Sequence, residues 1–237
     1  DGWSQEILER EICALHDARA RGVPAALAPL PHDYADYAVW QASTAKDPER
    51  QKRLGFWKDT LAGPLSVLDL PVIGARPEMA PTEGDIESAA LPKGLVEPLA
   101  ALARREQATL FMVLLAAYAT LLHRITGQDE VVVGTPIANR AHAATLGMIG
   151  YFANTLALRI DLSGSPTFQE LLGRVRRTCL AAYENQDIPF EELVEALNVE
   201  RDLGRSPIFQ TIFAFEDAMP VAGRRAVGQA GVLAVVG

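Results

Sequence analysis

Residues 108–140, ATLFMVLLAAYATLLHRITGQDEVVVGTPIANR, hold the longest apolar stretch of the chain and a strand pattern directly after it. The apolar stretch approaches the length of a membrane span, but its Thr, Tyr and His-Arg interruptions are typical of a helix in a protein core, here 109–126. Residues 129–140 then indicate a short apolar strand, bounded by Gly134 and Pro136, that runs into a polar loop. A buried helix followed at once by a strand predicts a fold that mixes both.

The chain after this pair continues the mixture. Residues 155–162 indicate a strand, and Pro166 suits the first position of the helix that follows. Thr167 and Glu170 make the capping-box pattern of a helix start. One face of this helix carries Phe168, Leu171, Leu172, Val175, Cys179 and Tyr183.

Another helix and a closing strand are predicted next. Residues 187–197 begin with Pro189 and place Glu191 and Glu192 in the first turn, where they favour the helix dipole. Residues 206–217 end in an alternating strand pattern. Strands and helices in this order predict an α/β fold with two lobes.

The chain before residue 71 looks helical. Residues 3–20 carry apolar side chains at helical spacing and stop at Gly22 and Pro24. A second helix spans 47–63, begun by Asp47-Pro48 and closed by Gly63-Pro64.

Residues 71–84 separate this helical part from the rest. They are rich in Pro and Gly and have no apolar period, which indicates a crossing between lobes. Residues 85–92 then predict a strand and residues 95–105 a helix. The tail, 218–237, has small residues without a period and no assigned structure.

Composition excludes several classes of protein. The 237 residues are 49% hydrophobic and 22% charged, and the net charge of -8 has no acidic tail or basic block. These values are typical of a cytoplasmic enzyme and predict no nucleic-acid and no membrane partner. Cys13 and Cys179 lie on the apolar sides of predicted helices, which indicates buried reduced thiols rather than a disulfide, and no spacing suggests a metal site.

Each remaining motif has an ordinary structural explanation when taken alone. The stretch NQDIPFEELV fits a helix start with Asp187 as the cap and Phe190 packed into the core. In GYFANTLALRI, Gly150 fits a turn and Asn154 a side chain that satisfies a backbone group. The four histidines do not cluster, and the sequence has no nucleophile elbow, Walker loop or dinucleotide fingerprint.

Five short segments, taken together in their order along the chain, indicate a family. They are DGWS (1–4), YADYAVWQ (34–41), IGYFANT (149–155), NQDIPFE (185–191) and RDLGRSPIFQ (201–210). In this order and spacing the chain resembles the condensation domains of nonribosomal peptide synthetases over about residues 1–217. The resemblance implies a fold like that of chloramphenicol acetyltransferase, with two lobes in a V and a tunnel that admits a phosphopantetheine-linked thioester from each face.

The resemblance also divides the chain. It implies the C-terminal part of an incomplete first lobe at 1–70, the crossing at 71–84, an incomplete second lobe at 85–217 and an unassigned tail at 218–237. We expect a chain truncated at both ends, in which the tail does not match the closing elements of the second lobe.

The resemblance places the chain's first residues in a catalytic motif. In the family this motif reads His-His, three variable residues and Asp-Gly, and Asp1 and Gly2 match its last two positions while both histidines are absent from this sequence. The family's Asp pairs with an arginine upstream, so Asp1 is expected to be unpaired. Since the second histidine acts at the attacking amine, residues 1–237 alone are expected to be inactive.

The activity implied is peptide-bond formation between a donor acyl thioester and an acceptor aminoacyl thioester, with no metal and no directly bound cofactor. The substrates would be carried on the phosphopantetheine of donor and acceptor peptidyl carrier proteins, beside adjacent synthetase domains. The residues expected near the tunnel or in support between the lobes are Asn154, Gln186, Asp187 and Arg205. Trp3 and Trp40 are expected in the core.

Three other functions stay open. The same fold occurs in epimerase-type domains and in ester-forming acyltransferases, and DGWS weighs against the epimerase, whose corresponding stretch typically places Ser before Trp. The third is a noncatalytic remnant that only docks a carrier protein.

Overall fold

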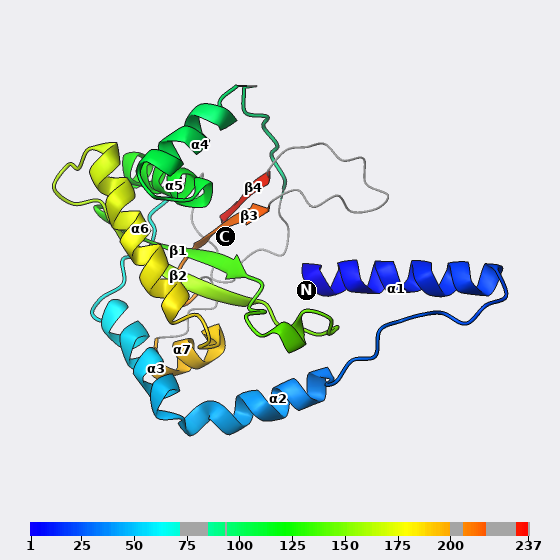
Figure 1. The fold of residues 1–237 in the computed structure, drawn as a ribbon. Coiled ribbons are helices and arrows are strands. Elements are labelled where there is room, and N and C mark those ends of the chain that lie inside the picture. Colours follow the sequence, from blue (N-terminus) through cyan, green and yellow to red (C-terminus); the bar gives the residue numbers. More distant parts are fainter. Residues whose placement is uncertain (72–84, 93, 200–205, 217–230, 237) are drawn as a thin grey trace.

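The structure, a computed structural model, describes residues 1–71, 85–92, 94–199, 206–216 and 231–236. Its centre is a four-stranded sheet of order β2-β1-β3-β4 (Figure 1). The strands are β1 (Glu130–Ile137), β2 (Asn154–Asp161), β3 (Thr211–Glu216) and β4 (Gly231–Val236). β1 pairs antiparallel with β2, from Glu130↔Asp161 to Ile137↔Asn154, and parallel with β3, which pairs antiparallel with β4.

α5 (Leu110–Thr126) and α6 (Phe168–Glu184) pack on the sheet, and α4 (Val96–Arg105) packs against α5. The others are α1 (Gly2–Ala20), α2 (Tyr34–Ser43), α3 (Pro48–Thr60) and α7 (Phe190–Leu197), with the 3-10 turns η1 (Thr44–Lys46) and η2 (Ala143–Thr145). α3 packs against α7, while α1 begins beside the loop after β1 and projects away from the sheet (Figure 1).

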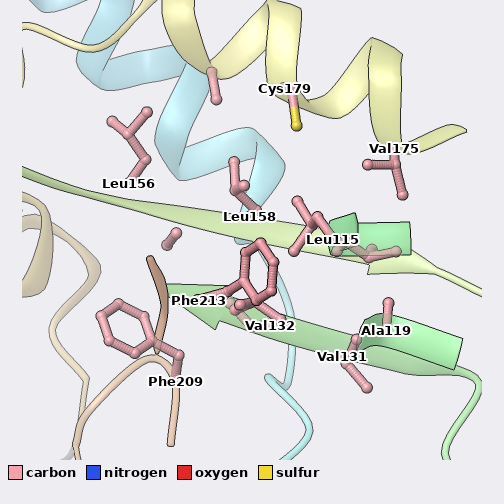
Figure 2. Close-up of a cluster of buried hydrophobic side chains, with 14 of the residues drawn as sticks. Leu115, Ala119, Val131, Val132, Leu156, Leu158, Val175, Cys179, Phe209 and Phe213 are labelled. Atoms are coloured by element: carbon pink, nitrogen blue, oxygen red, sulfur yellow. The ribbon is translucent and has the colours of Figure 1, made fainter. Parts of the chain in front are cut away.

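The core lies between the sheet and α5 and α6. Figure 2 shows Leu115 of α5 and Cys179 of α6 over the strands, with Phe213 of β3 among them. All three are 2% exposed or less. The apolar stretch of α5 is therefore a core helix, as its interruptions predicted.

The predicted helix boundaries are mostly confirmed. Thr167 and Glu170 form the predicted capping box of α6. Pro166, however, precedes the cap instead of occupying the first helical turn, because Thr167 itself accepts the backbone N–H of Glu170. At the end of α5, Gly127 has φ 71°, a conformation that suits glycine.

One predicted strand is absent, and one observed strand was not predicted. Residues 85–92 form no strand, because every one of them is exposed and no neighbouring strand pairs with them. The tail, which had no assignment, contributes β4 along the full length of β3. The sheet thus gains an edge strand from residues outside the five matched segments. Of the proposed crossing, residues 72–84 lie outside the described part of the chain.

The cysteines differ from each other. Cys179 is buried as predicted, but Cys13 is exposed, because the face of α1 that carries it has no packing partner among the described residues.

In the described part of the chain no single helix is long and apolar enough to cross a membrane. Only α4 and α5 taken together, bent by 102°, reach the required length and composition.

Candidate functional site

Asp1 caps α1 and also binds a distant segment. Its Oδ1 accepts the backbone N–H of Ser4 at 2.8 Å, and its Oδ2 accepts the backbone N–H of Phe152 at 2.9 Å. A carboxylate at a helix start also interacts favourably with the helix dipole. Asp1 therefore joins the beginning of α1 to the segment that leads into β2.

Arg140, in the loop after β1, is the partner of Asp1. Its Nη2 lies 3.2 Å from Asp1 Oδ1, and the two side chains are only 1% and 7% exposed. Asp1 is thus ion-paired, and the prediction that it stands unpaired was wrong, because the cation comes from a loop 139 residues downstream instead of from an upstream segment. Two close buried charges stabilise one arrangement, and losing either partner would leave the other uncompensated.

Backbone carbonyls accept from the other terminal nitrogen of Arg140, whereas its Nε has no hydrogen-bond partner among the described residues. Nη1 donates to Met148 O at 2.8 Å and to Thr145 O, so the arginine also fixes the loop that contains η2. Its carbon lies 4.1 Å from the centre of the Phe152 ring, within the range of a cation–π contact. Burial lowers the pKa of Arg140 from its usual value, but an arginine remains charged at neutral pH.

Aromatic side chains of α2 cover the same segment. The Tyr34 hydroxyl donates to Tyr151 O at 2.9 Å, and the Tyr37 ring lies 4.7 Å from that of Phe152. Burial, and then the neighbouring Tyr34, raise the pKa of Tyr37. Trp3 and Trp40 are not core residues: they are 43% and 46% exposed. The Trp3 indole donates to Leu146 O, and the Trp40 ring contacts those of Tyr37 and His142.

Asn154 connects this segment to the loop before α7. Its Nδ2 donates to Gln186 O at 3.0 Å and Ile188 O at 2.7 Å, and its Oδ1 accepts from the backbone N–H groups of Phe190 and Thr155. These four bonds use the full capacity of the amide. Asn154 is therefore a support between two chain segments and has no free group for a substrate.

One face of α3 holds the other side of that loop and the first turn of α7. Arg50 pairs with Glu192, and Arg53 pairs with Asp187. The Trp57 indole donates to Asn185 O at 2.8 Å. The interpretation of Asp187 as a helix cap was wrong, because α7 begins after Pro189 and the Asp187 carboxylate binds Arg53 instead.

Residues 150–154 are the centre of these contacts. Gly150 binds Ser4, Phe152 binds Asp1, and Asn154 binds the 186–190 loop. The structure thus brings Asp1, Asn154 and the Gln186 backbone to one short segment. Gly2 begins α1 beside it, and Arg205 lies outside the described residues.

Sequence reasoning missed Ser4, Arg50, Arg53 and Arg140 as members of this network. The only signal for Arg140 was its position directly after a buried strand, where a charged side chain is close to the core. Among the described residues, no group of three His, Cys, Asp or Glu side chains is placed to hold a metal ion. The arrangement holds backbone segments in fixed positions, and its carboxylates are occupied by ion pairs or caps.

Comparison with known proteins identifies relatives over nearly the whole chain. The Condensation domain family model matches residues 1–224. A linear gramicidin synthase protein of Brevibacillus parabrevis is 45% identical over 217 residues, which are 92% of this chain and 3% of that protein. The chain therefore spans only a small part of this curated relative.

Solved structures agree with the sequence matches. The X-domain from teicoplanin biosynthesis is 25% identical with a TM-score of 0.83, covering 99% of this chain and 60% of that one. A four-domain nonribosomal peptide synthetase bound to AMP and glycine is 24% identical with a TM-score of 0.82, over 98% of this chain and 18% of that one. The predicted α/β fold of the chloramphenicol acetyltransferase type is confirmed.

Proposed function

Because the chain belongs to the condensation-domain family of nonribosomal peptide synthetases, we propose that it is part of a domain that joins two carrier-bound acyl units. The observation that carries the proposal is the buried pair between Asp1 and Arg140. Asp1 and Gly2 match the end of the family's catalytic motif, and the pair fixes that end against residues 150–154.

The proposed reaction forms an amide. The amine of an acceptor aminoacyl thioester attacks the carbonyl carbon of a donor thioester, the carbon–nitrogen bond forms and the carbon–sulfur bond breaks. The amine loses a proton, and the donor carrier leaves as a thiol. Both substrates are tethered through phosphopantetheine to carrier proteins, so the protein's main contribution is orientation of the two reactants.

The described residues of this network support this role by holding backbone segments in place. The carboxylate of Asp1 is bound by Arg140 and by two backbone N–H groups, which suits a fixed structural group better than a proton acceptor. Asn154 and Asp187 act as supports of the loop that contains Gln186. Residues 1–237 contain no His-His pair, and we propose that proton management comes from histidines placed before the Asp-Gly pair in a complete motif.

A chimera tests the proposal. Residues 1–237 are joined to the segment that precedes the matched region in the linear gramicidin synthase relative, which restores a complete motif. Donor and acceptor thioesters on carrier proteins are mixed with it, and condensed product is followed by intact-protein mass spectrometry. We expect product from the chimera and none from residues 1–237 alone or after the motif's second histidine is replaced by Ala.

A folded chimera that binds both carriers and makes no product would contradict the proposal. It would favour a docking role instead, for which one observation speaks: a relative of the same fold, the X-domain, has been solved in complex with OxyB. Product from residues 1–237 alone would show that the histidines are not required.

A further inference from the structure

Ser4 is a buried polar residue whose hydroxyl is fully used. It is 6% exposed and lies in the first turn of α1. Its Oγ donates to Gly150 O at 2.7 Å and accepts from Gly150 N at 3.0 Å and from Arg140 Nη2 at 2.8 Å. One donor and two acceptor sites are all that a serine hydroxyl offers.

These bonds fix Gly150 on both of its polar groups. A side chain that binds the N–H and the C=O of one residue prevents that residue from sliding or turning relative to the helix. The Tyr34 ring of α2 also packs against Gly150, because a Cβ built on this glycine would overlap that ring. Gly150 is therefore clamped between α1 and α2.

Ser4 and Asp1 together attach α1 at two points. Asp1 binds Phe152, and Ser4 binds Gly150, two residues earlier on the same segment. The Trp3 indole adds a third, exposed contact from the same turn by donating to Leu146 O at 3.0 Å. The buried attachments at Gly150 and Phe152 together fix the direction of the helix more closely than either one alone. Beyond this turn, only Ile7 and Ala18 of α1 are buried, so the first turn carries most of the anchoring (Figure 1).

We propose that Ser4 is a positioning residue for the condensation reaction, an inference that rests on the proposed function. It sets the direction of the first turn of α1, and so the direction in which the motif's preceding residues approach the substrates. Its hydroxyl acts through Gly150 and Arg140 and touches no reacting atom. The role differs from that of the Asp1–Arg140 ion pair because the Ser4 side chain is neutral and holds both the N–H and the C=O of one residue, Gly150.

The kinetic test compares Ser4→Ala, Ser4→Thr and Ser43→Ala in the active chimera. Ser4→Ala removes the clamp without adding atoms, and a displacement of the motif by a fraction of an ångström to about 1 Å should lower kcat about 10- to 100-fold with little change in KM. Ser4→Thr keeps the hydroxyl and should restore most of kcat. Ser43→Ala is the matched control, since Ser43 Oγ donates to Trp40 O within α2 and makes no other hydrogen bond to the described residues. An unchanged kcat in Ser4→Ala overturns the proposal, and so does an equal loss in Ser4→Thr.

A second measurement needs no activity and separates this inference from the proposed function. A nitroxide spin label is attached to the exposed Cys13 of α1 in residues 1–237. In NMR spectra it broadens the amide signals of nearby residues in the rest of the protein, and the pattern of broadening reports the direction of α1. Ser4→Ala should change this pattern and speed hydrogen exchange at Gly150, and Ser4→Thr should not. An inactive chimera with this change would refute the proposed function while supporting the clamp. An unchanged pattern would refute the clamp even in an active chimera.

Discussion

Some side-chain contacts of the site could be predicted from the sequence, and others could not. The interpretation of Asn154 as a side chain that satisfies backbone groups is confirmed, because its amide binds the 186–190 loop. Its place near the tunnel or in support between the lobes stays a prediction. Arg140 was missed, because its partner Asp1 lies 139 residues away and no local pattern links the two. Short polar side chains near turns leave a signal in the sequence, whereas a long-range ion pair does not.

Substitution of Gly134 should destabilise the protein, because there is no room for a side chain at this position. An added Cβ would lie 2.5 Å from the Phe209 ring, which is buried and packed against Phe190. Gly134→Ala should therefore lower the free energy of unfolding by about 1–3 kcal/mol. Gly173→Ala in α6 is the control: the nearest atom lies at 3.8 Å, and helix propensity should raise the free energy of unfolding by up to about 1 kcal/mol. Urea denaturation measures both, and equal effects of the two variants would contradict the packing argument.

The two cysteines should react at very different rates. Burial raises the pKa of Cys179 to about 12, and its side chain is inaccessible, so almost no thiolate is available at pH 8. Cys13 is exposed on α1. Iodoacetamide at pH 8 should add one group to the native protein and two after unfolding, as read by intact mass. Peptide mapping should place the first group on Cys13. Modification of Cys179 in the native protein would show that α6 opens readily.

Whole elements were predicted best where their signals are local. The capping box of α6 and the Asp47-Pro48 start of α3 are set by residues three or fewer apart, and both were confirmed. Strands depend on a partner from elsewhere in the chain. The pattern at 85–92 therefore gave a false strand, and β4 was missed although it pairs fully with β3.

The two ion pairs that α3 makes, one with α7 and one with the loop before it, should differ in strength. Arg50 is 12% exposed and Glu192 30%, whereas Arg53 and Asp187 are 36% and 46% exposed. Arg50→Met would leave a partly buried carboxylate without its partner and should lower the free energy of unfolding by about 1–3 kcal/mol. Arg53→Met should cost less than about 1 kcal/mol because solvent screens that pair. Urea titration measures the free energy of unfolding of both variants. If Arg53→Met lowers it as much as Arg50→Met or more, solvent exposure does not control the strength of these ion pairs.

The whole molecule combines a packed sheet with a helix that stands off from it. The apolar pattern of α1 predicted the helix itself, but it could not show which side would be covered. Ile7 is 2% exposed, yet Trp3, Leu8, Ile12 and Leu15 are each 43% exposed or more. Their spacing places most of them on one side of the helix, where they form the exposed apolar face of α1.

This face should make residues 1–237 associate. At about 25 cal/mol per Å² of apolar surface, covering a few hundred Å² is worth roughly 5–10 kcal/mol, comparable to the stability of a domain. We expect the protein to bind the dye ANS and to self-associate in sedimentation experiments. The double substitution Leu8→Lys with Ile12→Lys should reduce both signals without lowering the melting temperature, since neither side chain is in the core. Ile86→Lys is the control, because Ile86 is 82% exposed outside any helix or strand and its loss should leave dye binding unchanged. A monodisperse protein without dye binding would mean that the face finds cover within these residues.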